Sequence, residues 1–353
     1  MSPVSPRRRQ GPASARVSLA IRPPFKLASR VHKNVGQAFD GGLVVLISII
    51  GAGRVGSVSA FNILRMRIAD VTLVDVQEGL AEGEALDLIQ SSPAIEFDGK
   101  INGTTKISDI EGSELVILAA GVARKPGMSR SELLERNGSI VSTLVDEIVR
   151  YAPACKIMMV TNPVDVMTYL AYSKSGFERN RVFGMGGILD TLRYRSYIAL
   201  ELNVSREDIR ALVIGEHGDQ MIPLVDYTTI AGIPVRKLLD EAAINHIVEK
   251  TRSSGSDVIS LKGGTVYAPA AVIAVMAEAI LRGRNRVLAA PVVPNGEYGL
   301  RNLAIGLPII LGKDGVEKII ELPLDDATQS HLMESAKAIY SGIEKLRLDS
   351  GGP

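Results

Sequence analysis

The residue types best suited to acid–base chemistry lie in the stretch Gly215-Glu216-His217-Gly218-Asp219. His217 is one of four histidines in the chain, and it follows the apolar run 211–214. An imidazole exchanges a proton near neutral pH, and the glycines on either side leave room for a substrate. An apolar run that ends at a glycine predicts a strand followed by a loop. Because a loop histidine can also lack any function, the rest of the chain must decide between these interpretations.

Asp190 and Arg193 form a second pair of candidate residues. They lie three residues apart in a predicted helix over 188–202, which places them on one face of that helix. An ion pair on a solvated face is the usual meaning of this spacing. The alternative is that the face looks into a cleft, where Asp190 reaches His217 and Arg193 binds a substrate carboxylate. A planar guanidinium suits that task because it can donate two parallel hydrogen bonds.

Three cations, Arg124, Lys125 and Arg130, lie in a loop and at the start of the helix that follows it. Ser129 and Glu132 have capping-box spacing, which predicts the helix start and puts Arg130 in its first turn. An arginine there opposes the helix macrodipole, so a role in binding an anionic substrate is one interpretation. A Pro-Gly pair in the loop could form the bend of a lid. A solvated basic loop is the alternative.

These residues need a framework, which begins with a nucleotide-binding pattern. The apolar run 43–50 predicts a buried strand that ends in Gly51-Ala52-Gly53-Arg54-Val55-Gly56 and is followed by a helical pattern. Gly51 permits the tight turn, Gly53 lets the backbone approach a pyrophosphate and Gly56 allows close helix–strand packing. The helix N-terminus then attracts the anion.

Asp75 ends a second predicted strand, 71–75, and lies 19 residues beyond Gly56. A carboxylate at this place can accept hydrogen bonds from both hydroxyls of a ribose. It would repel a 2′-phosphate, and residues 76–78 include no arginine to bind one. The pattern therefore favours NAD over NADP.

Further strands are predicted over 114–120 and 156–161, with helical patterns between the strands. This alternation predicts a parallel, doubly wound sheet, in which ligands collect at the carboxyl ends of the strands. Gly121 and Asn162 fall at such ends, so each either lines the cofactor or serves only as a turn residue.

The second half of the chain has a different pattern. Thr265 precedes an Ala-rich predicted helix over about 268–282, and it could cap that helix or face the substrate. Short apolar runs between 285 and 322, broken by Pro-Asn-Gly and Lys-Asp-Gly turns, predict antiparallel strands, and 325–347 predicts a closing helix. The expected fold class is α/β: a doubly wound parallel sheet of the Rossmann type, followed by an α+β substrate domain with antiparallel strands.

Residues 1–42 are expected to stand apart from the NAD-binding domain at 43–184 and the substrate domain at 185–348. The first forty residues are rich in Pro, Ser and Arg and contain eight Lys or Arg against one acid, so we expect disorder. The composition is similar to that of an organelle transit peptide, which would imply an organellar matrix. We favour the alternative of a misassigned start and a cytoplasmic protein, because Gly41-Gly42 runs directly into a predicted core strand.

Composition argues against several other classes of function. The 32 basic and 38 acidic residues after position 40 make the body mildly acidic, which disfavours nucleic acid as a partner. The single Cys155 cannot form an intrachain disulfide and indicates a reducing compartment, and we expect it to be buried. The sequence has no 18-residue apolar run to span a membrane and no cluster typical of a metal site.

Taken together, these stretches resemble the lactate/malate dehydrogenase family. The resemblance extends from about Val44 to Leu346 and is closest to the lactate-dehydrogenase-like malate dehydrogenases of archaea and some bacteria. It rests on 51–56, Asp75, 124–130, 161–165, 189–193 and 215–219, whose order and spacing are specific to the family. It implies NAD as the cofactor and a homodimer or homotetramer.

The resemblance also implies a role for each matching residue. His217 would be the acid/base, with Asp190 as its orienting partner. In substrate binding, Arg193 would anchor the C1 carboxylate, Arg130 would polarise the C2 oxygen, Asn162 would bond substrate and nicotinamide ribose, and Thr265 would border the pocket. The residues expected to contact the cofactor are Gly51, Gly53, Arg54, Val55, Gly56, Asp75, Gly121, Asn137, Val160 and Asn162.

Arg124 bears on the choice of substrate. Lactate enzymes of the family usually have Gln at the matching position, whereas malate enzymes have Arg. A buried guanidinium that faced a methyl group would have no partner, at a cost of roughly 3–5 kcal/mol. Facing the C4 carboxylate of malate or oxaloacetate it is paired, and such a site can discriminate by about 10⁴-fold or more. The expected activity is NAD-dependent malate dehydrogenase. The alternatives are a lactate or broader 2-hydroxy-acid dehydrogenase and a non-catalytic NAD-binding scaffold.

Overall fold

The computed structural model of the protein describes residues 45–122 and 129–346. The extension 1–44, the loop that carries Arg124, and residues 347–353 lie outside the described residues. Among the helices of the described ranges, none has the combination of length and apolarity needed to cross a bilayer.

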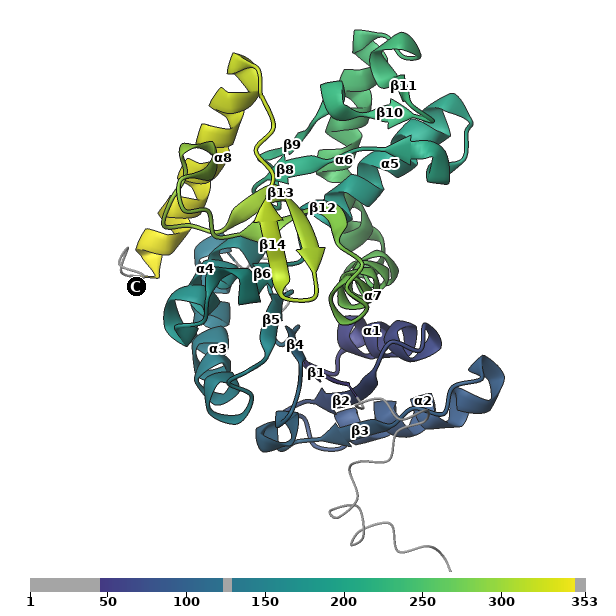
Figure 1. Cartoon of the computed structure of the whole chain (residues 1–353), viewed down its shortest axis with the longest axis vertical. Coiled ribbons are helices and arrows are strands. Elements are labelled where there is room, and N and C mark those ends of the chain that lie inside the picture. Colours follow the sequence, from purple (N-terminus) through teal and green to yellow (C-terminus); the bar gives the residue numbers. More distant parts are fainter. Residues whose placement is uncertain (1–44, 123–128, 347–353) are drawn as a thin grey trace, which may run out of the picture. The chain divides into compact units, whose positions relative to one another are not determined.

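A six-stranded parallel sheet forms the first half of the described chain (Figure 1). Its strands are β1 (Leu46–Ile50), β2 (Asp70–Val74), β3 (Ile101–Thr104), β4 (Leu115–Leu118), β5 (Lys156–Met159) and β6 (Val182–Gly184). The order across the sheet is β3-β2-β1-β4-β5-β6, so the winding reverses between β1 and β4. Ligands of doubly wound sheets bind at this reversal, beyond the carboxyl ends of the strands. β1 and β4 are almost entirely apolar and buried, because helices cover both faces of the sheet.

Four helices connect these strands. They are α1 (Arg54–Arg65), α2 (Leu80–Ile95), α3 (Arg130–Tyr151) and α4 (Val164–Ser175). In Figure 1, α3 and α4 lie together against one face of the sheet, and α1 lies on the opposite face. α3 begins where the capping-box spacing predicts, since Oγ of Ser129 accepts a hydrogen bond from the Glu132 amide at 3.1 Å.

The second half contains four long helices and two antiparallel sheets. The helices are α5 (Gly187–Leu202), α6 (Glu241–Lys262), α7 (Tyr267–Leu281) and α8 (Asp326–Lys345). The strands are β7 (Ile209–Arg210), β8 (Val213–Gly215), β9 (Met221–Pro223), β10 (Thr229–Ile230), β11 (Ile233–Pro234), β12 (Arg286–Val292), β13 (Ile305–Gly312) and β14 (Gly315–Ile319). One sheet has the order β12-β13-β8-β9 with β14 paired to β13, and the other has the order β11-β10-β7. The predicted fold class is confirmed.

The core consists mainly of Ile, Leu, Val, Ala and Met, as the shortage of aromatic residues requires, although Tyr169 and Phe183 are among its largest fully buried side chains. One cluster of buried side chains continues from the parallel sheet into β12, β13, α7 and α8. A smaller cluster lies among α5, β7, β10 and α6. Cys155 is fully buried in the first cluster, and burial raises the pKa of its thiol to about 12. This cysteine therefore behaves as an apolar core residue.

Several local features differ from the sequence-based expectation. β3, β6 and α6 were not predicted. β3 is short and contains Asn and Gly, and α6 contains a Ser-Ser-Gly-Ser segment that is typical of a loop. α6 persists because Asp240 caps its first turn, where its carboxylate accepts from the Ala243 amide at 2.8 Å, and Gly263 ends it with a φ of +82°. Thr265 does not cap α7, because the N-cap position belongs to Val266 and no side chain caps it.

Candidate active site

The loop between β1 and α1 has the geometry of a dinucleotide-binding turn. Gly51 has a φ of +106°, and a Cβ atom there would lie 2.6 Å from the amide nitrogen of Ala120. A Cβ atom on Gly56 would lie 1.9 Å from the carbonyl oxygen of Gly51. Both positions therefore require glycine, the first for the left-handed turn and the second for the close approach of helix and strand.

Gly53 meets a different requirement. It is the N-cap of α1, and a Cβ atom there would have nothing within 4 Å. Among the described residues, no side chain caps α1, and its first turn contains no acid. The first amides of the helix therefore remain available beside open space, and the helix dipole favours an anion there. This cradle fits the pyrophosphate of a dinucleotide.

Asp75 lies directly after β2 and is held against this loop. Its Oδ2 atom accepts a hydrogen bond from the Ala52 amide at 2.8 Å, and its Oδ1 atom accepts from the Gln77 amide at 2.9 Å. These two bonds fix the carboxylate beside the glycine turn, and each oxygen keeps a lone pair for another donor. The contact to Ala52 thus connects the carboxylate at the end of β2 to the glycine-rich loop after β1.

Asn137, Gly121 and Asn162 meet at the ends of β4 and β5. Asn137 is 1% exposed, and among the described residues its side chain bonds backbone groups only, those of Val122 (2.8 and 3.2 Å) and the carbonyl of Asn162 (2.7 Å). A Cβ atom on Gly121 would lie 2.6 Å from Cγ2 of Thr161. Asn137 thus links the residues that follow β4 to those that follow β5. Asn162 is exposed at the carboxyl end of β5, joined to Pro163 by a cis peptide bond, and Val160 is half-buried beside it.

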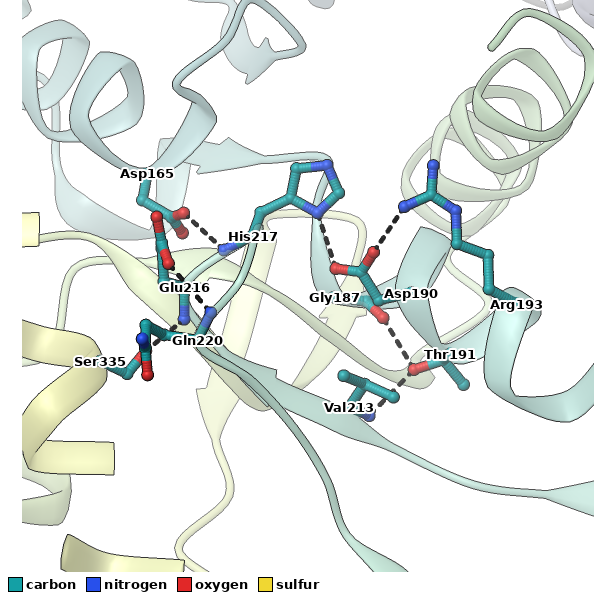
Figure 2. Close-up of polar contacts among 10 residues, drawn as sticks. All are labelled: Asp165, Gly187, Asp190, Thr191, Arg193, Val213, Glu216, His217, Gln220 and Ser335. Atoms are coloured by element: carbon teal, nitrogen blue, oxygen red, sulfur yellow. Dashed lines mark hydrogen bonds and ion pairs between the residues drawn. The ribbon is translucent and has the colours of Figure 1, made fainter. Parts of the chain in front are cut away.

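The structure brings His217, Asp190 and Arg193 into one cluster (Figure 2). His217 lies in the loop between β8 and β9, and its Nδ1 atom is 2.6 Å from Oδ2 of Asp190. Asp190 lies in the first turn of α5 and is 1% exposed. A carboxylate at Nδ1 selects the tautomer of the neutral ring that carries its proton there. Nε2, on the side of the ring that faces away from Asp190, is then the proton acceptor (Figure 2).

The electrostatic environment favours the charged form of this histidine. Burial alone would lower the pKa of His217, but the negative charge and hydrogen bond of Asp190 outweigh it and raise the pKa above its usual value. Arg193, also nearby, acts in the opposite direction. A histidine that is protonated more readily than usual, yet keeps a free nitrogen when neutral, can serve as acid and as base.

Arg193 forms the ion pair with Asp190 that their spacing suggested, but this pair is buried. Its Nη1 atom donates to Oδ1 of Asp190 at 3.0 Å, and its side chain is mostly buried, at 13% exposure. Its guanidinium lies against α6, because a Cβ atom on Gly255 would be 3.5 Å from both terminal nitrogens. The ion pair is therefore not on a solvated face.

Three polar residues that the sequence analysis did not assign to the site support it (Figure 2). Ser335 accepts from the Glu216 amide at 2.6 Å, and Asp165 accepts from the His217 amide at 2.8 Å. Thr191 accepts from the Val213 amide at 3.0 Å and donates to the Gly187 carbonyl at 2.7 Å, which joins α5 to β8. Asp165 had one available signal, its place in the stretch 161–165. Ser335 and Thr191 had none, because only the fold brings them near the loop.

Three further predicted residues can be placed only in part. Thr265 is half-buried in the connection between α6 and α7. Arg130 is the first residue of α3, and Arg124 lies outside the described residues. Within the described parts of the chain, no group of three or more His, Cys, Asp or Glu side chains is arranged to hold a metal ion.

Comparison with known proteins identifies the family. Residues 45–184 match the family model for the lactate/malate dehydrogenase NAD binding domain, and residues 188–347 match that for the lactate/malate dehydrogenase alpha/beta C-terminal domain. The chain belongs to the lactate/malate dehydrogenase family. The resemblance and the NAD cofactor expected from the sequence are confirmed, and the protein is an NAD-dependent oxidoreductase.

Individual relatives agree with this assignment. A malate dehydrogenase of Thioalkalivibrio sulfidiphilus is 46% identical over 304 residues, which is 85% of this chain and 99% of the relative. The solved structure of malate dehydrogenase from Salinibacter ruber has a TM-score of 0.82 at 43% identity and covers 86% of this chain and 98% of its own. A Cryptosporidium parvum lactate dehydrogenase, complexed with lactic acid and nicotinamide adenine dinucleotide, has a TM-score of 0.83 at 35% identity, with 86% and 98% covered. Because both kinds of enzyme share the fold, the choice of substrate depends on particular residues.

Proposed function

We propose that this chain is a malate dehydrogenase that catalyses the reversible, NAD-dependent oxidation of (S)-malate to oxaloacetate. The observation that carries the proposal is the cluster in which one buried carboxylate, Asp190, holds an imidazole on one oxygen and a guanidinium on the other. Such a cluster combines a proton acceptor with a binding group for a carboxylate. The 46% identity to a relative named malate dehydrogenase supports the same conclusion.

The residues around the nucleotide cradle fit NAD. The pyrophosphate would be bound at Gly53, Arg54 and Val55, the ribose at Asp75, and the nicotinamide end would lie near Gly121, Val160 and Asn162. NAD supplies the acceptor for the hydride that leaves C2 of the substrate. The carboxylate of Asp75 favours NAD over NADP, because it would repel a 2′-phosphate.

The proton follows a path set by His217. In malate oxidation, Nε2 of His217 takes the proton of the C2 hydroxyl, and the imidazolium that forms is stabilised by Asp190 through Nδ1. In oxaloacetate reduction, the protonated ring returns that proton to the C2 oxygen. Arg193 holds the C1 carboxylate beside the ring, which keeps the C2 oxygen within reach of Nε2.

Substrate choice is assigned to Arg124, with Arg130 as the group that supports negative charge on the C2 oxygen. Closure of the loop that carries Arg124 would exclude water from the reaction. Asn162 and Thr265 complete the substrate-binding set. The sequence supports the assignment of Arg124, because malate enzymes of the family have arginine at the matching position. Its positive charge can pair with the C4 carboxylate, which malate has and lactate lacks.

The protein is further proposed to be a cytoplasmic homodimer or homotetramer, with the boundary of its NAD-binding and substrate domains at 184/185. Exposed apolar side chains support self-association. Leu86 and Ile89 are exposed on α2, and Leu261 and Tyr267 are exposed where α6 meets α7. A cavity of about 380 Å³ lies between α1, α2 and α7, and Tyr267 is one of the residues that line it. Apolar surface of this kind is typical of an interface between copies, and light scattering on the purified protein tests it.

Substrate preference tests the proposed function. We expect NADH oxidation with oxaloacetate to exceed that with pyruvate in kcat/KM by about 10⁴-fold. Arg124→Gln should reduce this ratio, because it removes the partner of the C4 carboxylate, whereas Lys125→Gln, which removes a charge from the neighbouring position, should leave the ratio unchanged. A preference for pyruvate would identify a lactate dehydrogenase. Absence of turnover with either substrate would favour a non-catalytic NAD-binding scaffold.

A further inference from the structure

Asp165 is a buried acid that the proposed mechanism does not use. It lies in the first turn of α4 and is 2% exposed. Its Oδ2 atom accepts the His217 amide at 2.8 Å, whereas its Oδ1 atom has no hydrogen-bond partner among the described residues. Burying a carboxylate with one oxygen unpaired is costly, and an apolar or neutral residue would avoid the cost. An ionisable group at this position therefore calls for a functional explanation.

The hydrogen bond of Asp165 connects two separate parts of the site. Asp165 lies three residues after Asn162, in the helix α4 that follows β5 on the cofactor-binding side. The loop of His217 belongs to the other half of the chain, between β8 and β9. The Asp165–His217 bond thus fixes the backbone of the acid/base relative to the cofactor-binding strand ends (Figure 2).

The neighbouring amide of the same loop provides a comparison. Glu216 N donates to Ser335 on α8, a neutral hydroxyl that is fully buried. Two successive amides are therefore held by two buried side chains from different helices, and only the one next to the reacting ring can ionise. A hydroxyl is enough to hold an amide, so an ionisable group at this position has a further effect.

Asp165 also affects the proton affinity of the His217 ring. The charged groups that face Asp165 are His217 and Glu216 on the loop and Asp190 on α5. Burial raises the pKa of the Asp165 carboxyl to about 7, the two other carboxylates add to this, and the His217 amide and ring oppose it. Conversely, Asp165 adds to Asp190 in raising the pKa of His217. The protonated ring thus lies between two acids, one at Nδ1 and one behind its backbone.

We propose that Asp165 is a positioning residue for the acid/base, which fixes the backbone of His217 against the cofactor-binding half and supports the positive charge of the ring. This inference rests on the proposed function for its kinetic consequences, but not for its effect on the titration of His217. Asp165 acts through His217 and needs no contact with the substrate.

Three variants test the proposal. Asp165→Asn keeps an oxygen that can accept the His217 amide but removes the charge, whereas Asp165→Ala removes both. Thr168→Ala is the matched control, because it removes another buried hydrogen-bonding side chain from the same helix, one that bonds the Val164 carbonyl at 2.7 Å and no other group in the described part of the chain. The measurements are the pH profile of kcat/KM for oxaloacetate reduction, the Kd for NADH from its fluorescence, and the titration of the His217 ring by NMR, assigned with His217→Asn.

We expect the titration midpoint of His217 to move to lower pH in both Asp165 variants and to stay in place in Thr168→Ala. Asp165→Ala should lose up to about 10²-fold in kcat, the size expected for a small displacement of a reacting group. Asp165→Asn should recover most of that loss, and NADH binding should stay near wild type. A midpoint in Asp165→Asn equal to wild type overturns the proposal, even if Asp165→Ala does not fold. Because the NMR titration needs no turnover, it separates this outcome from a failure of the malate dehydrogenase assignment.

Discussion

At the scale of single residues, Asp190 joins two functions. One of its oxygens accepts the hydrogen bond of His217, and the other holds Arg193. Both interactions are strong because the carboxylate is buried, where solvent screens charge weakly. The proton-transferring group and the anion-binding group are therefore fixed relative to each other by one side chain.

Asp190→Asn tests whether Asp190 acts through its charge or only through packing, because asparagine has nearly the same shape as aspartate but no charge. The imidazolium loses its stabilising partner and the neutral ring loses its preferred tautomer, so kcat should fall by about 10²–10⁴-fold. The Kd for NADH should change little, since the cofactor cradle lies on another element. Steady-state kinetics and fluorescence titration measure the two quantities, and wild-type turnover in the variant would contradict the orienting role.

The pH dependence of the two reaction directions should be opposite. Oxaloacetate reduction needs the protonated ring, so its kcat/KM should be high at low pH and fall as pH rises through the pKa of His217. Malate oxidation needs the neutral ring and should rise over the same range. Because Asp190 raises this pKa against the lowering effect of burial, the midpoint should lie above the usual value of about 6.5. Initial rates over a pH series in both directions measure it, and a midpoint below the usual value would exclude this electrostatic effect.

At the scale of elements, the turn between β1 and α1 contains one glycine that the fold requires and another that leaves open space for a ligand. Gly56→Ala places a Cβ atom 1.9 Å from a backbone oxygen and should destabilise the protein by about 1–3 kcal/mol. Gly53→Ala meets no atom and has a φ of −67°, which alanine adopts freely, so the melting temperature should stay near wild type. Its methyl group would enter the space proposed for the pyrophosphate, so the Kd for NADH should rise about tenfold, a change of about 1.4 kcal/mol.

Thermal unfolding and NADH fluorescence titration distinguish the two variants. If Gly53→Ala binds NADH as tightly as the wild type, the pyrophosphate does not lie at the N-terminus of α1. A Gly56→Ala protein with unchanged melting temperature would show that helix and strand can separate at this point without cost.

Two elements show which parts of the fold could be predicted from the sequence and which could not. The β1–α1 turn was predictable because its signals are local: an apolar run, glycines at fixed spacing and Asp75 at the next strand end. α6 was not, since its Ser-Ser-Gly-Ser segment favours a loop and its stability comes from the Asp240 cap and from packing of Ile244 and Ile247. Tertiary packing overrides weak local propensity in such a helix.

At the scale of the whole molecule, the site combines residues that lie far apart in the sequence. Asp165 comes from α4, Asp190 from α5, His217 from the β8–β9 loop and Ser335 from α8. The sequence could pair Asp190 with His217 through the family resemblance. It could not show that Asp165 and Ser335 hold adjacent amides of the loop, because those contacts join residues 52 and 119 positions apart.

The most direct test of the acid/base assignment is His217→Asn, studied in the complex with NADH. The substituted amide side chain would retain polarity at the site but could not exchange the proton of the C2 oxygen. We expect NADH to bind with near wild-type affinity and its oxidation on mixing with oxaloacetate to slow by about 10²–10⁴-fold at every pH, the range of a lost general acid. Oxidation at the wild-type rate would contradict the assignment of His217 as the acid/base.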